Sequence, residues 1–101
     1  MKKIFFSQRF HGKSERVVFE ERARVRKYLE WLLETKIEII DQYHLEAPNS
    51  APPTWNWSQD LLLLGKADLV VFSHDWETAL GCQVEMLACE KYKIPHMIIP
   101  I

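Results

Sequence analysis

The sequence has no hydrophobic run long enough to cross a membrane and no excess of charge of one sign. A bilayer-spanning helix needs roughly 20 apolar residues, whereas the run Ile4–Phe6 after Met1, Lys2 and Lys3 is cut by polar side chains and is too short for a signal peptide. The 13 basic and 14 acidic residues give a net charge of -1, so no overall field directs the chain to polyanions. We therefore expect a cytoplasmic protein that binds neither a nucleic-acid polymer nor a membrane.

Cysteine and glycine are scarce, and the histidines are not clustered. Cys82 and Cys89 lie seven apart in one predicted helix, with Cα atoms about 10 Å apart, which is beyond the roughly 7 Å that a disulfide spans. The four histidines lack metal-ligand spacing, and the three glycines form no phosphate-binding motif. We expect no disulfide, no metal site and no P-loop.

Two hydrophobic periods alternate along a chain of 101 residues, a length that suits one domain over 1–101. The pattern predicts strands at 3–7, 37–41, 68–73 and 96–99, and helices at 14–34, 55–67 and 78–93. Ser14 is the expected N-cap of the first helix, whose apolar stripe is Val18, Val25, Leu29 and Leu32. Prolines at 48, 52 and 53 indicate a long loop over 42–54.

This alternation of strands and helices is typical of a parallel sheet with right-handed crossovers. We predict an α/β, doubly wound, flavodoxin-like sheet of four strands in the order 2-1-3-4, with helices on both faces. Ligands of such sheets bind at the C-terminal ends of the strands, which here carry the loops 7–14, 41–54 and 73–81. The first loop precedes a helix N-terminus and is suited to an anion; a merely solvated turn is the alternative.

Glu85 is placed by helical periodicity among small and apolar residues. Its face of the predicted helix also holds Gly81, Ala88, Cys89 and Tyr92, while Gln83 and Glu90 lie on the opposite side. Burying a carboxylate costs several kcal/mol unless it is paired. Glu85 is therefore either a functional group or a buried structural contact to a partner such as Arg9 or Tyr92.

Three segments together resemble the nucleoside 2-deoxyribosyltransferase superfamily, which includes deoxynucleoside monophosphate N-glycosidases and small uncharacterised phage and bacterial relatives. The segments are 4–9 (IFFSQR), 60–72 (DLLLLGKADLVVF) and 76–88 (WETALGCQVEMLA). The resemblance covers nearly the whole chain. It implies cleavage of the N-glycosidic bond of a small-molecule (deoxy)nucleoside or nucleotide, with base release or transfer to another base, and no cofactor.

The resemblance also implies roles for particular residues. Glu85 matches the catalytic nucleophile and Asp60 an active-site aspartate, while Ser7, Gln8 and Arg9 match the segment that lines the sugar and, in the monophosphate hydrolases, the phosphate. From the expected chemistry, further substrate-binding candidates are Asp75, for sugar hydroxyls or the base, Trp76, for stacking together with Trp55 and Trp57, and Gly81, which leaves room for the ligand. For the three tryptophans, packing in the fold is the alternative.

Family members form homodimers or larger homo-oligomers, and apolar surface such as Trp31 or Leu64 is what a partner subunit would cover. A non-catalytic nucleotide-binding or interaction protein of the same fold is the alternative to an enzyme.

Overall fold

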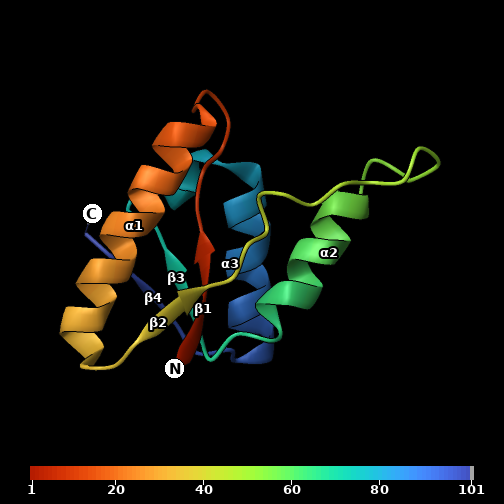
Figure 1. Ribbon diagram of the computed structural model, residues 1–101. Helices are drawn as coiled ribbons and strands as arrows, with labels where there is room; N and C mark the ends of the chain where they lie inside the picture. Colours follow the sequence, from red (N-terminus) through yellow and green to blue (C-terminus); the bar gives the residue numbers. More distant parts are fainter. Residues whose placement is uncertain (101) are drawn as a thin grey trace.

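The structure, a computed structural model, describes residues 1–100 as a single sheet with helices on both faces (Figure 1). The elements are β1 (Lys2–Ser7), α1 (Glu15–Leu33), β2 (Ile37–Ile39), α2 (Trp55–Leu64), β3 (Leu69–Phe72), the 3-10 helix η1 (Trp76–Thr78), α3 (Leu80–Tyr92) and β4 (His96–Ile98). All neighbouring strands pair in parallel, in the order β2-β1-β3-β4. The predicted flavodoxin-like α/β fold is confirmed.

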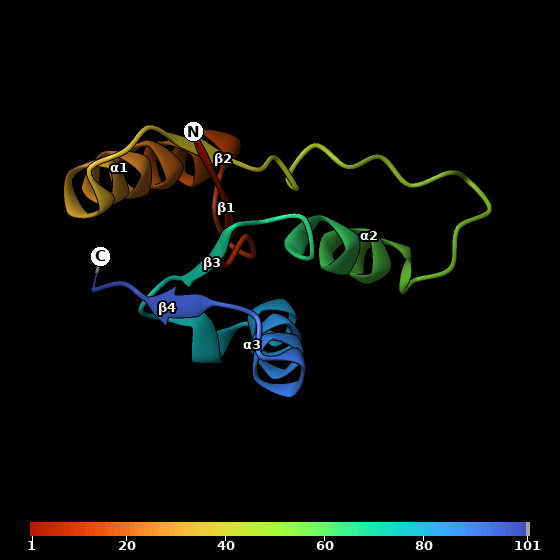
Figure 2. The same cartoon turned by 90° about the horizontal axis from the view of Figure 1, so that it is seen from below.

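The sheet has a separate apolar layer on each face. Figure 2 shows α1 on one side of the strands and α2 with α3 on the other. Alternation along β1 sends Ile4 and Phe6 toward α1 and Phe5 toward α2 and α3. The α1 layer is completed by Val25, Leu29, Ile37, Val71 and Ile99, and the opposite layer by Leu64, Val70, Phe72, Met86 and Cys89.

Helix α1 begins as expected, but its buried stripe differs from the prediction. The Ser14 side chain accepts a hydrogen bond from the Val17 amide, which confirms the N-cap. Leu32 is 41% exposed, whereas Arg22 is only 5% exposed. Arg22 follows Val18 by four residues and therefore lies on the same face of the helix, so the stripe contains a charged residue that the apolar pattern did not reveal.

The boundaries of several elements also differ from the prediction. Helix α2 stops at Leu64, three residues early, and the predicted helix 78–93 is divided, because Ala79 has an extended backbone (φ -124°, ψ 125°) between η1 and α3. The segment between β2 and α2 is the long loop that the prolines indicated, and in Figure 1 it extends away from the sheet beside α2.

Two of the side chains expected at particular surfaces lie elsewhere. Leu64, the last residue of α2, is buried in the core and is not available to a partner subunit, while Trp31 is 73% exposed on α1. Tyr92 is 73% exposed at the end of α3 and does not share the buried face of Glu85. None of the helices in residues 1–100 combines the length and apolar character needed to cross a membrane.

Candidate functional site

A cavity of about 430 Å³ lies where the loops after β1 and β2 meet the first turns of α2 and α3. This is the C-terminal edge of the sheet, at which doubly wound folds bind their ligands. Loop residues Gln8 and Arg9, α2 residues Trp57 and Asp60, and α3 residues Gly81 and Glu85 are among those that line it. The structure thus brings Arg9, Asp60 and Glu85 around one cavity.

Glu85 lines this cavity from the second turn of α3 and is 8% exposed. Its Oε1 atom accepts a hydrogen bond of 2.6 Å from the Oγ atom of Ser7, the fully buried last residue of β1. The partner is therefore neither Arg9 nor Tyr92, the two that the sequence suggested. Burial raises the pKa of Glu85 to about 7, although the hydrogen bond from Ser7 opposes that shift.

Asp60 faces the same cavity from α2 and has an unusual hydrogen-bonding state. Its Oδ1 atom is buried and has no hydrogen-bond partner among residues 1–100. Burial raises the pKa of Asp60 to about 6, against the lowering effect of the Arg22 charge. A buried oxygen without a partner in a cavity is available to a ligand atom, since unsatisfied buried polar groups are costly.

The two carboxyl groups influence each other electrostatically. After burial, the negative charge of Asp60 is the remaining cause that raises the pKa of Glu85. Both groups therefore exchange protons near neutral pH, whereas ordinary carboxyl groups are fully ionised there. Paired carboxyl groups with raised pKa values in a cavity are typical of sites for acid, base or nucleophilic chemistry.

The loop after β1 contributes two side chains of different character. Gln8 is buried, and its amide nitrogen donates to the carbonyl of Val18 at 3.0 Å and to Glu21 at 2.7 Å. Gln8 is thus held by protein groups, while the partly exposed Arg9 carries its positive charge at the cavity. At Gly81 no atom outside its immediate neighbourhood in residues 1–100 lies within 4 Å of the place that a Cβ would take, so the space beside this glycine is open.

Asp75 and Trp76, two of the predicted substrate contacts, are not among the residues that line the cavity. Asp75 accepts a hydrogen bond of 2.7 Å from Ser73, which holds the pKa of that carboxyl below its usual range, and it lines a separate hollow of about 70 Å³. Trp76 packs on Phe72 with ring centroids 6.0 Å apart, as part of the core. Of the three tryptophans considered for stacking, Trp57 is the one that lines the cavity.

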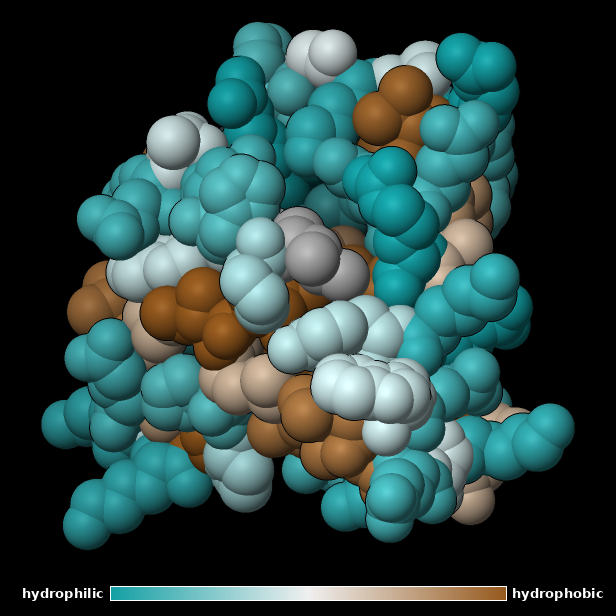
Figure 3. All heavy atoms as spheres, turned by 90° about the vertical axis from the view of Figure 1, so that its left-hand side faces the viewer, coloured by the Kyte–Doolittle hydropathy of each residue, from teal (hydrophilic) through white to brown (hydrophobic). Residues whose placement is uncertain are grey.

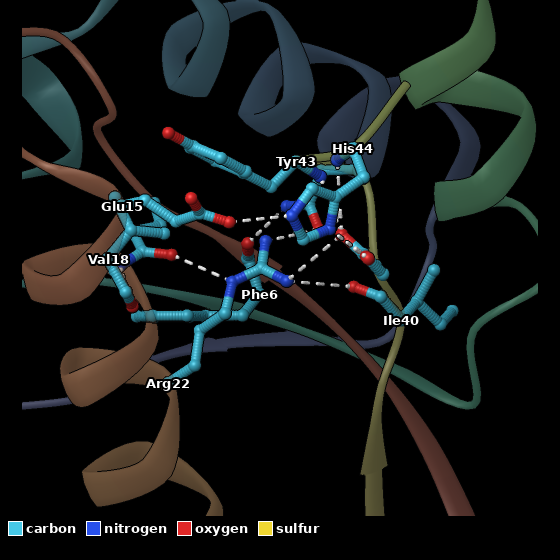
Figure 4. Close-up of polar contacts among 10 residues, drawn as sticks. Phe6, Glu15, Val18, Arg22, Ile40, Tyr43 and His44 are labelled. Atoms are coloured by element: carbon cyan, nitrogen blue, oxygen red, sulfur yellow. Dashed lines mark hydrogen bonds and ion pairs between the residues drawn. The ribbon is translucent and has the colours of Figure 1, made fainter. Parts of the chain in front are cut away.

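Sequence reasoning missed Arg22 and Gln42, which connect α1 to the cavity. Arg22 donates from Nε to the Gln8 side-chain oxygen at 3.1 Å and from Nη2 to the Gln42 side-chain oxygen at 2.6 Å. Figure 4 shows its side chain reaching from α1 toward the Ile40 carbonyl, at 3.4 Å. Its place four residues after Val18 was the available signal, because that position falls within the buried stripe.

A second cluster of polar side chains holds the long loop against the start of α1. His44 lies between two carboxylates, with Nδ1 2.7 Å from Asp41 and Nε2 2.8 Å from Glu15 (Figure 4). The hydrogen bonds to these two groups raise the pKa of His44, and the imidazole stacks on Phe19 at 5.3 Å. This contact holds the segment that includes Gln42 near the end of the sheet.

Within residues 1–100, no group of three or more His, Cys, Asp or Glu side chains is placed to hold a metal ion. Cys82 and Cys89 are free and buried, and burial raises the pKa of each thiol to about 11.

Comparisons with models of protein families, with curated proteins and with solved structures give no match to this chain. The cavity offers a ligand two carboxyl groups, an arginine and an aromatic ring.

Proposed function

We propose that this chain cleaves the N-glycosidic bond of a (deoxy)nucleoside or nucleotide, with Glu85 as the nucleophile. The observation that carries the proposal is the buried Glu85 carboxyl group, held by Ser7 in one cavity with Asp60. The resemblance of three sequence segments to nucleoside 2-deoxyribosyltransferases supports the same reaction. The cavity volume of about 430 Å³ suits a small-molecule ligand, since such sites span about 300–1,000 Å³.

In the proposed first step, a Glu85 carboxylate oxygen bonds to the anomeric carbon as the bond between that carbon and the base nitrogen breaks. The bonding electron pair leaves with the base. Positive charge builds on the sugar during this step, and a nearby carboxylate stabilises it before forming the covalent bond. Water then attacks the anomeric carbon and gives its proton to Asp60, which became a carboxylate when it protonated the base. The bond from that carbon to Glu85 breaks and Glu85 leaves as a carboxylate, giving the free sugar or sugar phosphate; attack by the nitrogen of a second base gives transfer instead.

Asp60 is the proposed proton donor to the departing base. A base leaves more readily when its nitrogen is protonated, and a carboxyl group near its own pKa at working pH performs this transfer efficiently. Between the pKa values of Asp60, about 6, and Glu85, about 7, a minority of the molecules holds Asp60 protonated and Glu85 ionised, which is the form that this step requires. Its Oδ1 atom, which has no hydrogen-bond partner within residues 1–100, is free to meet the substrate.

Two further side chains fit parts of the proposed substrate. The Arg9 cation at the cavity suits the 5′-phosphate of a nucleotide. Trp57 offers a ring on which a base can stack, a contact worth about 1–3 kcal/mol. We therefore expect Arg9→Ala to lower kcat/KM for nucleotides more than kcat/KM for nucleosides, so that the ratio of the two values falls.

The deciding experiment measures base release by chromatography from deoxynucleosides and their 5′-monophosphates, with and without a second free base. Glu85→Gln removes the charge and nucleophilicity while keeping the shape, so release should fall by at least about a thousandfold. Glu90→Gln, at an exposed position of the same helix, is the matched control and should keep wild-type activity. Equal turnover in Glu85→Gln and wild type would remove Glu85 from the mechanism, and binding of nucleotides without release would identify a non-catalytic binder.

We also propose that the chain forms a homodimer through the surface that contains Trp31 and Leu32 near the end of α1. Both side chains are substantially exposed, and Figure 3 shows apolar side chains among hydrophilic ones on the α1 side of the molecule. Burying such groups is the main driving force for association. Light scattering should report a dimer for wild type and for the control Lys66→Ala, an exposed position after α2 on the opposite face of the sheet, and a monomer for Trp31→Lys.

A further inference from the structure

We propose that Arg22 is a positioning residue of the candidate active site, holding Gln8 and Gln42 along the cavity and supplying positive charge to Asp60. The inference rests on the proposed function for its catalytic meaning. The orientation of the Gln8 and Gln42 side-chain amides and the protonation of the Asp60 carboxyl group can both be measured without turnover.

The surroundings of Arg22 hold its guanidinium in one place. Three of its nitrogens donate to oxygen atoms, and its central carbon lies 5.8 Å from the ring centroid of Phe10 and 5.3 Å from that of Phe19. Removing such a cation from water costs several kcal/mol unless its donors are matched. The planar fork of arginine meets several fixed acceptors at once, which a lysine ammonium on a flexible stem does not.

Arg22 fixes the orientation of the two glutamine side chains that line the cavity. The oxygen of each amide accepts from Arg22, while the nitrogens of Gln8 and Gln42 donate to the carbonyls of Val18 and Phe6, at 3.0 Å and 2.7 Å. Turning either amide over would set donor against donor and acceptor against acceptor. One guanidinium therefore joins the loops after β1 and β2 to α1, and so sets the wall of the cavity on that side.

Arg22 also acts on Asp60 through its charge. The titratable and charged groups that line the cavity with Asp60 are Glu85 and Cys82 from α3 and Arg9 and His11 from the loop after β1. Arg22 contacts the two glutamines that line the same cavity. Arg22 lowers the pKa of Asp60, while burial raises it. Asp41 also interacts with the Arg22 charge, since its Oδ1 lies 3.8 Å from Nη1 of Arg22. Asp41 does not line the cavity.

Two variants separate the two roles. Arg22→Lys keeps a positive charge but loses the fork, so the Asp60 pKa should stay near its wild-type value while KM rises about tenfold, as expected for the loss of one charged hydrogen bond. Arg22→Gln removes the charge, so the pKa of Asp60 should rise and the Asp60 limb of the pH profile should move to higher pH. Arg26→Gln, at an exposed position one turn later on α1, is the control and should change neither quantity.

The measurement is carbon-detected NMR titration of the Asp60 carboxyl in the whole chain, together with the side-chain amide signals of Gln8 and Gln42. We expect those amide signals to shift or broaden in Arg22→Lys and to stay unchanged in Arg26→Gln. An unchanged Asp60 pKa in folded Arg22→Gln, or unchanged amide signals in Arg22→Lys, would overturn the proposal. If Arg22→Gln does not fold, the amide signals and KM of Arg22→Lys decide it. If the wild type releases no base, the proposed function fails while the NMR titration still tests Arg22.

Discussion

Ser7 at the end of β1 donates a 2.6 Å hydrogen bond to Glu85 of α3, a residue 78 positions later in the chain. The bond joins the first strand of the sheet to its last helix at the edge where the cavity lies. It also offsets part of the cost of burying a carboxylate, because a hydrogen bond to the charged form favours that form. The Ser7 hydroxyl therefore contributes to both the position and the ionisation of Glu85.

Removing that hydroxyl should raise the pKa of Glu85 above about 7. Ser7→Ala should move the rising limb of the pH-rate profile to higher pH and destabilise the protein by about 1–3 kcal/mol, since a buried carboxyl loses its donor. Ser73→Ala also removes a buried serine that donates to a carboxylate, but outside the cavity. Both variants should therefore lose stability in urea titrations, whereas only Ser7→Ala should change the pH-rate profile. Superimposable profiles for Ser7→Ala and wild type would contradict this role.

Glu85 should make wild-type stability fall as the pH rises from about 4.5 to about 7. The folded state holds the Glu85 proton up to a pKa of about 7, whereas the unfolded chain releases it near the ordinary glutamate pKa of 4.5. The stability present below pH 4.5 is therefore lost as the pH rises through 7. The full effect is on the order of 3 kcal/mol. Glu85→Gln should therefore gain stability relative to wild type over this range, measured by denaturant unfolding at several pH values. A difference that is constant with pH would contradict the raised pKa.

Two aspartates should respond to neutralisation with opposite signs. The pKa of Asp60 is raised to about 6 and that of Asp75 is lowered by its hydrogen bond from Ser73. The free energy of unfolding of wild type should fall as the pH rises from about 4 through 6, because the folded state holds the Asp60 proton more tightly than the unfolded chain does. Asp60→Asn lacks this loss and should therefore gain stability relative to wild type over the same range. Asp75→Asn should be less stable than wild type at neutral pH, with the difference disappearing in acid. Thermal unfolding of both variants at pH 4 and pH 8 tests the pair; shifts of the same sign would contradict the assignment.

His44 should stabilise the protein in mild acid. Its pKa is raised above 6.5, chiefly by the hydrogen bond to Asp41 and next by that to Glu15, so its contribution is complete below pH 6.5 and is lost as the pH rises through the folded-state pKa. His44→Gln should be less stable than wild type at pH 6 and approach it at pH 9, in melting curves at low salt. A deficit of His44→Gln that grows with pH would contradict the bridge.

The two thiols should resist alkylation in the folded protein. Burial raises the pKa of Cys82 and Cys89 to about 11, so roughly one thiol in a thousand is the reactive thiolate at pH 8. Iodoacetamide labelling followed by mass spectrometry should show slow modification of native protein and rapid modification in urea. Native labelling as fast as that of a small-molecule thiol would show that these side chains are accessible.

Much of the fold followed from local patterns. The apolar runs at β1 and β3 and the helical stripe of α1 predicted the elements, and the alternation of strands and helices predicted the sheet order. Glu85 was also found from the sequence, because a carboxylate among small and apolar residues at helical spacing indicates a buried charge. Each element and the face of Glu85 were predicted from residues within one or two turns of each other, and the sheet order from the succession of elements along the chain. Both kinds of signal are present in the sequence itself.

The contacts that define the candidate site depend on the tertiary structure. Ser7 rather than Arg9 is the partner of Glu85, and Arg22 reaches Gln8 and Gln42 from the buried stripe of α1. Asp75, although next to the predicted ligand edge, instead bonds to Ser73. Which of several polar side chains meet across a sheet edge is decided by how strands, loops and helices pack in three dimensions, and periodicity along one element contains no information about the groups on another.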